Sequence, residues 1–114
     1  MCIRDSFCIM ANYTAESVNA LMSHPESRMA AVKSLVEAAG GKLVSMYSMV
    51  AEGPGAMVIM DIPDPGVAPA ITGVVASSGA VKDIKFFRLL SQDEVVEVRK
   101  KAAQLRPSYK PPSK

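Results

Sequence analysis

Four short apolar segments limit how this chain of 114 residues can fold. They cover residues 7–12 (FCIMAN), 42–50 (KLVSMYSMV), 57–62 (MVIMDI) and 81–90 (VKDIKFFRLL). Each has the length and the flanking residues of a β-strand. Long stretches separate the first from the second and the third from the fourth, whereas a short glycine-containing stretch joins the second to the third. This spacing predicts two strand–helix–strand units whose inner strands form a hairpin.

The long stretches carry apolar residues at helical spacing, with capping residues at their starts. Thr14 supplies an N-cap hydroxyl to the first helix, which breaks near Pro25, in the first turn of the part that continues to Gly40. Asp64 caps a second helix, and Ser91 opens a capping box before a terminal helix. The order β-α-β-β-α-β predicts an α+β, ferredoxin-like fold with a four-stranded antiparallel sheet and an extra C-terminal helix.

Gly53-Pro54-Gly55 raises the question of a phosphate-binding loop. A dinucleotide fingerprint places its glycines after a strand and at the start of a helix, so that backbone amides face the phosphate. Gly53 and Gly55 instead lead into the strand of residues 57–62, and no third glycine follows at the required spacing. We therefore predict a turn here and expect no cofactor.

The length suits a single domain, which we expect over residues 6–105. Residues 1–5 resemble translated adapter remnants, so we expect a non-native leader there. Residues 106–114 are rich in Pro and Lys and are expected to form a disordered basic tail. No segment has the pattern of a membrane span. Cys2 and Cys8 match no metal or redox spacing, so we expect a reducing cytoplasm.

Charge is distributed unevenly along the chain. Residues 1–98 hold seven basic and eleven acidic side chains and thus carry −4, while residues 99–114 hold six basic and no acidic ones and carry +6. A basic end can bind nucleic acid. Basic side chains are also favourable at a helix C-terminus, and a solvated helix end is the preferred interpretation, so no nucleic-acid partner is expected.

Several short motifs in a fixed order resemble the GYD domain family over roughly residues 7–98. They are Asn12-Tyr13-Thr14, residues 40–43 (GGKL), Tyr47 and residues 63–64 (PD). The resemblance implies a ferredoxin-like fold related to the dimeric α/β-barrel proteins, with a largely uncharacterised function. The family is named for an element with a Tyr and an Asp just before the third strand. Those positions fall here on Pro54 and Gly55, so this chain lacks any chemistry those side chains carry.

Both faces of the predicted sheet are substantially apolar. Along each strand the residues of both parities are apolar, as with Phe7 and Ile9 against Cys8 and Met10. Because helices cover only one face, a monomer would expose a large apolar patch, which usually marks an interface or a binding groove. We expect a homodimer of the dimeric α/β-barrel type, packed through the sheet face. The alternative is that the last helix or the tail covers the sheet of its own chain.

Specific chemistry is thinly represented in the sequence. RNA recognition of the usual kind needs aromatics on the first and third strands, which offer only Phe7, and copper transfer needs paired cysteines after the first strand. No catalytic triad, carboxylate pair or metal cluster is evident, so no metal is expected. Polar candidates for a ligand site near a dimer cavity are Asn12, Tyr13, His24, Tyr47, Glu52 and Arg88. Asp61 is a candidate ion-pair partner for Arg88.

Two interpretations of function stay open. The first is a homodimer that binds a small apolar or aromatic molecule, or acts as a regulatory or interaction module; adaptable Met side chains suit such a cavity. The second is a cofactor-free monooxygenase or isomerase in which Asn12, Tyr47 or His24 positions an aromatic substrate. Whether the chain is an enzyme is left open.

Overall fold

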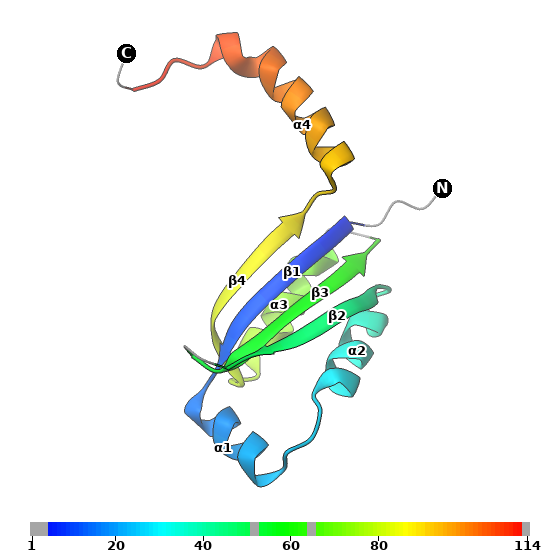
Figure 1. Cartoon of the computed structure of the whole chain (residues 1–114), viewed down its shortest axis with the longest axis vertical. Coiled ribbons are helices and arrows are strands. Elements are labelled where there is room, and N and C mark those ends of the chain that lie inside the picture. The colour runs from blue at the N-terminus through cyan, green and yellow to red at the C-terminus, as the bar shows by residue number, and fades with distance from the viewer. Residues whose placement is uncertain (1–4, 51–52, 64–65, 113–114) are drawn as a thin grey trace.

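A four-stranded antiparallel sheet forms the centre of the molecule in the computed structural model, which describes residues 5–50, 53–63 and 66–112. The strands are β1 (Asp5–Tyr13), β2 (Lys42–Met49), β3 (Gly55–Ile62) and β4 (Val81–Leu89), in the order β2-β3-β1-β4 (Figure 1). The two strands that open the strand–helix–strand units, β1 and β3, therefore lie side by side in the middle. This order confirms the predicted ferredoxin-like fold.

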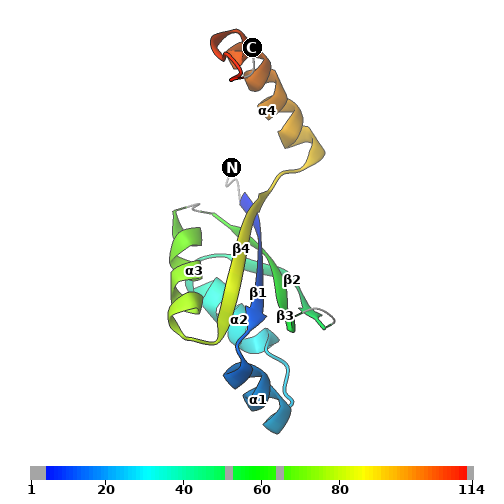
Figure 2. The ribbon, with the colours of Figure 1, turned by 90° about the vertical axis from the view of Figure 1, so that its left-hand side faces the viewer.

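Helices α2 (Met29–Ala38) and α3 (Val67–Ser77) lie on one face of the sheet and leave the other face uncovered (Figure 2). The register places Phe7 opposite Met60 and Ile9 opposite Val58, so alternate residues of the two central strands point toward these helices. They pack with apolar residues of both helices into one core, made of Phe7, Ile9, Val36, Val58, Met60, Ile62, Ala68 and Ile71.

The first helical region is divided, as predicted, into α1 (Ala15–Ser23) and α2. Thr14 caps α1 by accepting a hydrogen bond from the Ser17 backbone N–H at 3.3 Å. The prediction that Pro25 lies in the first turn of the second part is wrong, because α2 begins only at Met29. Residues 24–28 instead form an extended connection, and α1 lies beyond the end of the sheet (Figures 1 and 2). Gly40 ends α2 with a φ of 81°, a left-handed conformation that suits glycine.

The Gly-Pro-Gly stretch contributes to the sheet as well as to the turn. Gly53 has a φ of 80°, as the predicted turn requires. Gly55, however, already belongs to β3 and pairs with Asn12 of β1 and Met49 of β2. The third strand therefore begins two residues before the predicted start at Met57, because a strand without side-chain bulk at Gly55 can approach β1 closely.

Helix α3 begins at Val67, after the Gly66 N-cap. The predicted cap, Asp64, lies outside the described residues. Pro69 fits the first turn of α3, because the N–H that proline lacks has no helical acceptor there.

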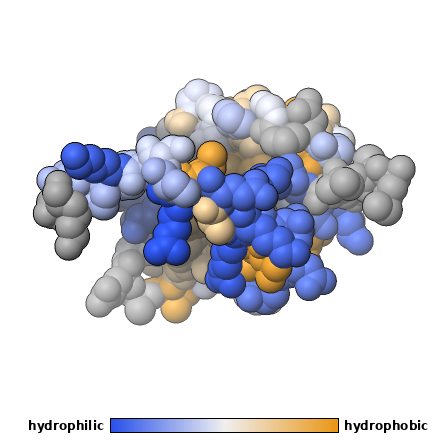
Figure 3. All heavy atoms as spheres, turned by 90° about the horizontal axis from the view of Figure 1, so that it is seen from above, coloured by the Kyte–Doolittle hydropathy of each residue, from blue (hydrophilic) through white to orange (hydrophobic). Residues whose placement is uncertain are grey.

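The last helix, α4 (Gln92–Leu105), projects from the end of β4 away from the sheet (Figures 1 and 2). Its start is fixed by the predicted capping box between Ser91 and Glu94, and the short helical turn η1 (Arg106–Ser108) follows it. Because α4 projects away, the alternative that this helix covers the sheet of its own chain is wrong for the described residues. Seen from the end where α4 projects, hydrophilic side chains make up much of the surface, with hydrophobic ones between them (Figure 3).

Candidate functional site

A cavity of about 490 Å³ opens between the helices and the covered face of the sheet. Its floor is formed by core residues of the central strands, including Ile9, Val58 and Met60. Its walls come from α1 and α2 on one side and from α3 on the other, with Val36 and Ile71 facing it. Most of the lining is aliphatic, so the interior suits an apolar molecule.

The cavity exists because α1 does not pack over the sheet. Backbone and side-chain bonds hold the start of α1 to the connection between α3 and β4. The Thr14 N–H donates to the Ala80 carbonyl at 3.1 Å, and the Ser17 hydroxyl donates to the same carbonyl at 2.8 Å. These bonds direct α1 past the end of the sheet, and the chain returns to it only at α2. The space between α2 and α3 is therefore left open at this end.

Polar side chains gather on the rim where α1 passes into α2. Tyr13, His24, Glu26 and Arg28 all border the cavity. The backbone positions this connection, since the His24 N–H donates to the Ala20 carbonyl at 2.9 Å and ends α1. Within the described part of the chain, no hydrogen bond or ion pair engages the side chains of His24, Glu26 or Arg28. The guanidinium of Arg28, the carboxylate of Glu26 and the imidazole of His24 are therefore available to a ligand at the mouth of an apolar cavity.

A second, smaller recess of about 260 Å³ adjoins this rim. Tyr13, Glu26 and Arg28 border both spaces, and Tyr47 of β2 borders the smaller one. Three of the candidates from the sequence, Tyr13, His24 and Tyr47, therefore lie around two adjoining spaces.

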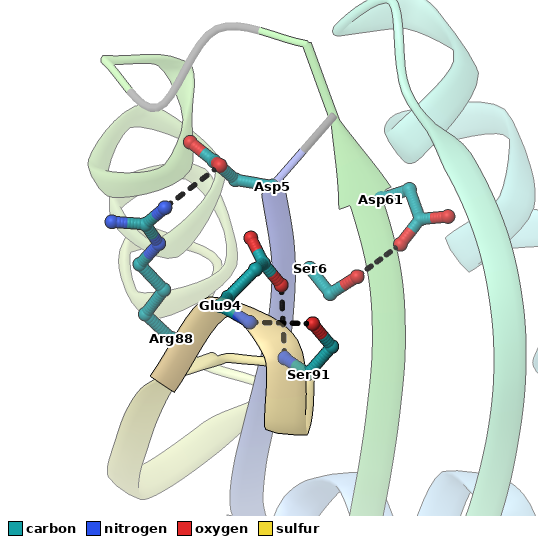
Figure 4. A network of polar contacts seen from close by, with 6 residues as sticks. All are labelled: Asp5, Ser6, Asp61, Arg88, Ser91 and Glu94. Carbon is teal, nitrogen blue, oxygen red and sulfur yellow. Dashed lines mark hydrogen bonds and ion pairs between the residues drawn. The ribbon is translucent and has the colours of Figure 1, made fainter. Parts of the chain in front are cut away.

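Asn12 and Arg88 lie elsewhere, and Glu52 lies outside the described residues. The Asn12 amide donates to the Asp83 carboxylate at 3.4 Å, beside an irregularity of the β1–β4 pairing where Asp83 has a φ of 53°. Arg88 forms an ion pair of 2.9 Å with Asp5 (Figure 4). The suggested partner, Asp61, instead accepts a hydrogen bond from the Ser6 hydroxyl at 2.6 Å. The register explains this, because Asp61 and Ser6 are cross-strand partners, whereas Arg88 lies opposite Phe7.

The uncovered face of the sheet carries a second group of apolar side chains. Cross-strand pairing aligns them in two rows, one through Cys8 and one through Met10. We call this group the uncovered face: Cys8, Met10, Tyr47, Met57, Ile59 and Phe87. Phe87 is 45% exposed and Tyr47 61% exposed. Cys8 is buried among its neighbours, and this burial raises the pKa of its thiol, which makes it a weak nucleophile at neutral pH.

The residues Glu26 and Arg28 were missed in the sequence, and so was this cavity on the helix-covered side. The cavity expected within a dimer, against the uncovered face, is a different space and stays a prediction. The signal available was the break at Pro25, since an interrupted helix cannot cover the sheet continuously. Among the described residues, no group of three or more His, Cys, Asp or Glu side chains could hold a metal ion. No described helix has the length and apolar character needed to cross a membrane.

Comparison with known proteins gives a family and a fold. A family model described as GYD domain matches residues 7–98. The crystal structure of 30S ribosomal protein S6 from Thermotoga maritima is similar with a TM-score of 0.50 and 14% sequence identity, covering 90% of this chain and 99% of that one. At that identity the likeness supports the ferredoxin-like fold alone. No curated protein matches the sequence.

Proposed function

This chain belongs to the GYD domain family, and we propose that it is a homodimeric domain that binds a small apolar or aromatic molecule. The observation that carries the proposal is the cavity of about 490 Å³ between the helices and the sheet. Ligand sites of small molecules typically occupy about 300–1,000 Å³ and combine an apolar lining with a few polar groups. The cavity meets both conditions.

The arrangement of the lining favours a ligand with an apolar body and one polar end. The inner part is aliphatic, with Met46 and Met60 able to adapt to an irregular shape. The polar groups are confined to the rim, where Arg28 and Tyr13 can donate hydrogen bonds and Glu26 can accept them. A ligand would therefore insert its apolar part and leave its polar group at the rim.

The dimer is supported by the uncovered face. Cys8, Ile59 and Phe87 form one apolar row across three strands, and Met10, Met57 and Tyr47 form the next. No helix covers these rows in the described residues (Figure 2). A contiguous apolar surface of this kind is commonly an interface. Substitution of Phe87 by Glu should therefore convert a dimer into monomers, as measured by light scattering during gel filtration.

Native mass spectrometry of protein purified without harsh washing tests the ligand. The expected result is a reproducible extra mass, which is lost in Ala20→Trp and in Val75→Trp, because each indole fills the cavity from a different wall. Val96→Trp, on the exposed surface of α4, is the matched control and should keep the extra mass. Circular dichroism shows whether each variant is folded.

Two outcomes would overturn the cavity as the binding site. In one, the extra mass persists in both folded cavity variants. In the other, it disappears only in Phe87→Glu, which would place the ligand at the uncovered face instead. Absence of any extra mass, together with no thermal stabilisation by a panel of aromatic acids and alcohols, would remove ligand binding altogether.

A cofactor-free monooxygenase or isomerase is the second candidate. Its support is that Tyr13 and His24 border the same apolar cavity, where a proton donor or acceptor could act on a bound aromatic substrate. Of the three residues first suggested for this role, only His24 borders the cavity, since Tyr47 borders the adjoining recess and Asn12 neither space. If Tyr13→Phe and His24→Ala retain full ligand affinity and no turnover is detected with the wild type, the enzyme interpretation loses its support.

A further inference from the structure

Helix α4 carries an apolar stripe that the described residues leave largely exposed. The stripe consists of Val95, Val98, Ala102 and Leu105, spaced three and four residues apart along one side of the helix. Val98 is 49% exposed and Leu105 68% exposed, and no residue of α4 is buried. Apart from scattered contacts, α4 packs only against η1 among the described elements. An isolated helix of 14 residues is only marginally stable in water, so a partner for this stripe would stabilise it.

The connection from β4 to α4 is short, and α4 projects away from its own sheet (Figure 1). Only Leu90 and Ser91 lie between the end of β4 and the start of α4. Ser91 is held at both its backbone and its side chain, since its N–H donates to the Glu94 carboxylate at 2.8 Å and its hydroxyl accepts from the Glu94 N–H at 3.1 Å (Figure 4). These bonds fix where α4 begins, and its stripe stays exposed for contact with another molecule.

A second copy of the chain offers both an apolar surface and the complementary charge. The uncovered face is apolar, and none of the described helices lies over it (Figure 2). The terminal segment from the start of α4, residues 92–114, carries six basic and three acidic side chains and thus +3, whereas residues 1–91 carry seven basic and eight acidic ones and thus −1. The terminal segment is therefore opposite in charge to the remainder of another copy. Nucleic acid would match the charge but would leave the valines and Leu105 exposed to water.

We propose that α4 is an arm exchanged between two copies, its apolar stripe packing on the uncovered face of the partner. This inference rests on the proposed homodimer and specifies what covers its sheet. Exchange of a terminal element is a common route to dimers, because each copy supplies both the element and its docking surface. Two arms then complete one symmetrical assembly.

Full-length variants with matched charge changes test the arm. Val98→Asp combined with Leu105→Asp places two negative charges on the stripe. Val96→Asp combined with Gln104→Asp introduces two aspartates as well, but on the opposite side of α4. We expect the first pair to raise the dissociation constant of the dimer by about 100-fold or more, since each change removes a buried apolar anchor. The second pair should change it far less. Analytical ultracentrifugation measures both.

A crosslinking experiment separates this inference from the proposed dimer. p-Benzoylphenylalanine replaces Ala102, and copies labelled with ¹⁴N and ¹⁵N are mixed before irradiation. We expect crosslinked peptides that join α4 of one isotope to β2 or β3 of the other. Crosslinks confined to one copy, or a dimer that both aspartate pairs leave equally intact, would overturn the arm while the sheet-face dimer stands. A wild-type chain that stays monomeric would overturn both, and retention by a DNA column with no dimer would assign the arm to nucleic acid instead.

Discussion

The inner and outer helices of this molecule are held in different ways. The outer helices α1 and α4 begin with side-chain caps, at Thr14 and Ser91, and bury no residue. The inner helices α2 and α3 have no side-chain cap, yet α2 buries Val36 and α3 buries Ala68 and Ile71. Local hydrogen bonds thus define the outer helices, while burial in the core holds the inner ones.

This difference corresponds to the two proposed functions. Because α1 lies beyond the end of the sheet (Figure 1), it leaves the space between α2 and α3 open as a cavity. Because α4 makes almost none, its stripe is available to a partner. Elements of low local stability are often those used in binding.

The largest expected difference between core and outer helix comes from a pair of large-to-small substitutions. Ile62, in β3, has no exposed surface, whereas Leu105, in α4, is 68% exposed. We expect Ile62→Ala to lower the free energy of unfolding by about 2–5 kcal/mol, because it removes buried methylene groups and leaves a cavity. Leu105→Ala should change it by about 0.5 kcal/mol or less in the monomer. Urea denaturation at low protein concentration measures both, and similar losses would show that α4 is part of the core.

The next test compares two glycines, one in β3 and one in α3. A Cβ at Gly55 would overlap the Ala11 carbonyl oxygen of the neighbouring strand, whereas a Cβ at Gly73 in α3 would meet no atom within 4 Å. We expect Gly55→Ala to cost about 1–3 kcal/mol, as overpacking does. Gly73→Ala should stabilise the protein by up to about 1 kcal/mol, since alanine favours a helix. Thermal denaturation distinguishes them. Equal effects would mean that β3 can move away from β1 freely.

The same clash excludes a larger side chain at position 55. A side chain such as Asp cannot occupy position 55 with this backbone, and the Pro54 carbonyl accepts a hydrogen bond from the Tyr13 N–H at 2.7 Å. Positions 54 and 55 thus join the hairpin to the end of β1 through their backbone. They carry no side-chain chemistry here.

Sequence patterns predicted those parts of the fold that depend on neighbouring residues. Thr14, Gly40 and the Ser91 capping box were read correctly, because a cap requires a particular residue at a particular place. The strand order followed from the spacing of the apolar segments. Where the elements contact one another was harder to predict. The start of β3 depends on the close approach of Gly55 to β1, which no local pattern reports.

The candidate site was predictable only in part, for a similar reason. Tyr13, His24 and Tyr47 were named because their chemistry is distinctive, and they do lie around adjoining spaces. The side of the sheet on which the cavity lies depends on the direction α1 takes after Thr14. That direction is set by bonds to the Ala80 carbonyl, more than 60 residues away along the chain. Residue spacing carries no information about such a contact.

A smaller effect is expected from removal of the caps. Ser91→Ala should destabilise α4 by about 1 kcal/mol, the typical value of an N-cap. Because α4 is held mainly by its cap, amide hydrogen exchange should accelerate along α4 and not in β1 or β3. Thr14→Ala should act in the same way on α1. Faster exchange throughout the sheet after Ser91→Ala would show that the outer helix is coupled to the core.

The smallest expected effect is a dependence of α4 on pH through Glu94. Hydrogen bonds from the Ser91 backbone, and then from its side chain, lower the pKa of this carboxyl, with a smaller contribution from the nearby Arg88 charge. A carboxylate whose pKa is lowered on folding contributes stability above its unfolded pKa and loses that contribution as the pH falls through the folded value. Acidification should therefore fray α4 before the sheet unfolds. Glu94→Gln keeps an acceptor for the Ser91 N–H without the charge, so its α4 carbon chemical shifts should be insensitive to this titration. Identical pH profiles for wild type and variant would show that the fraying has another cause.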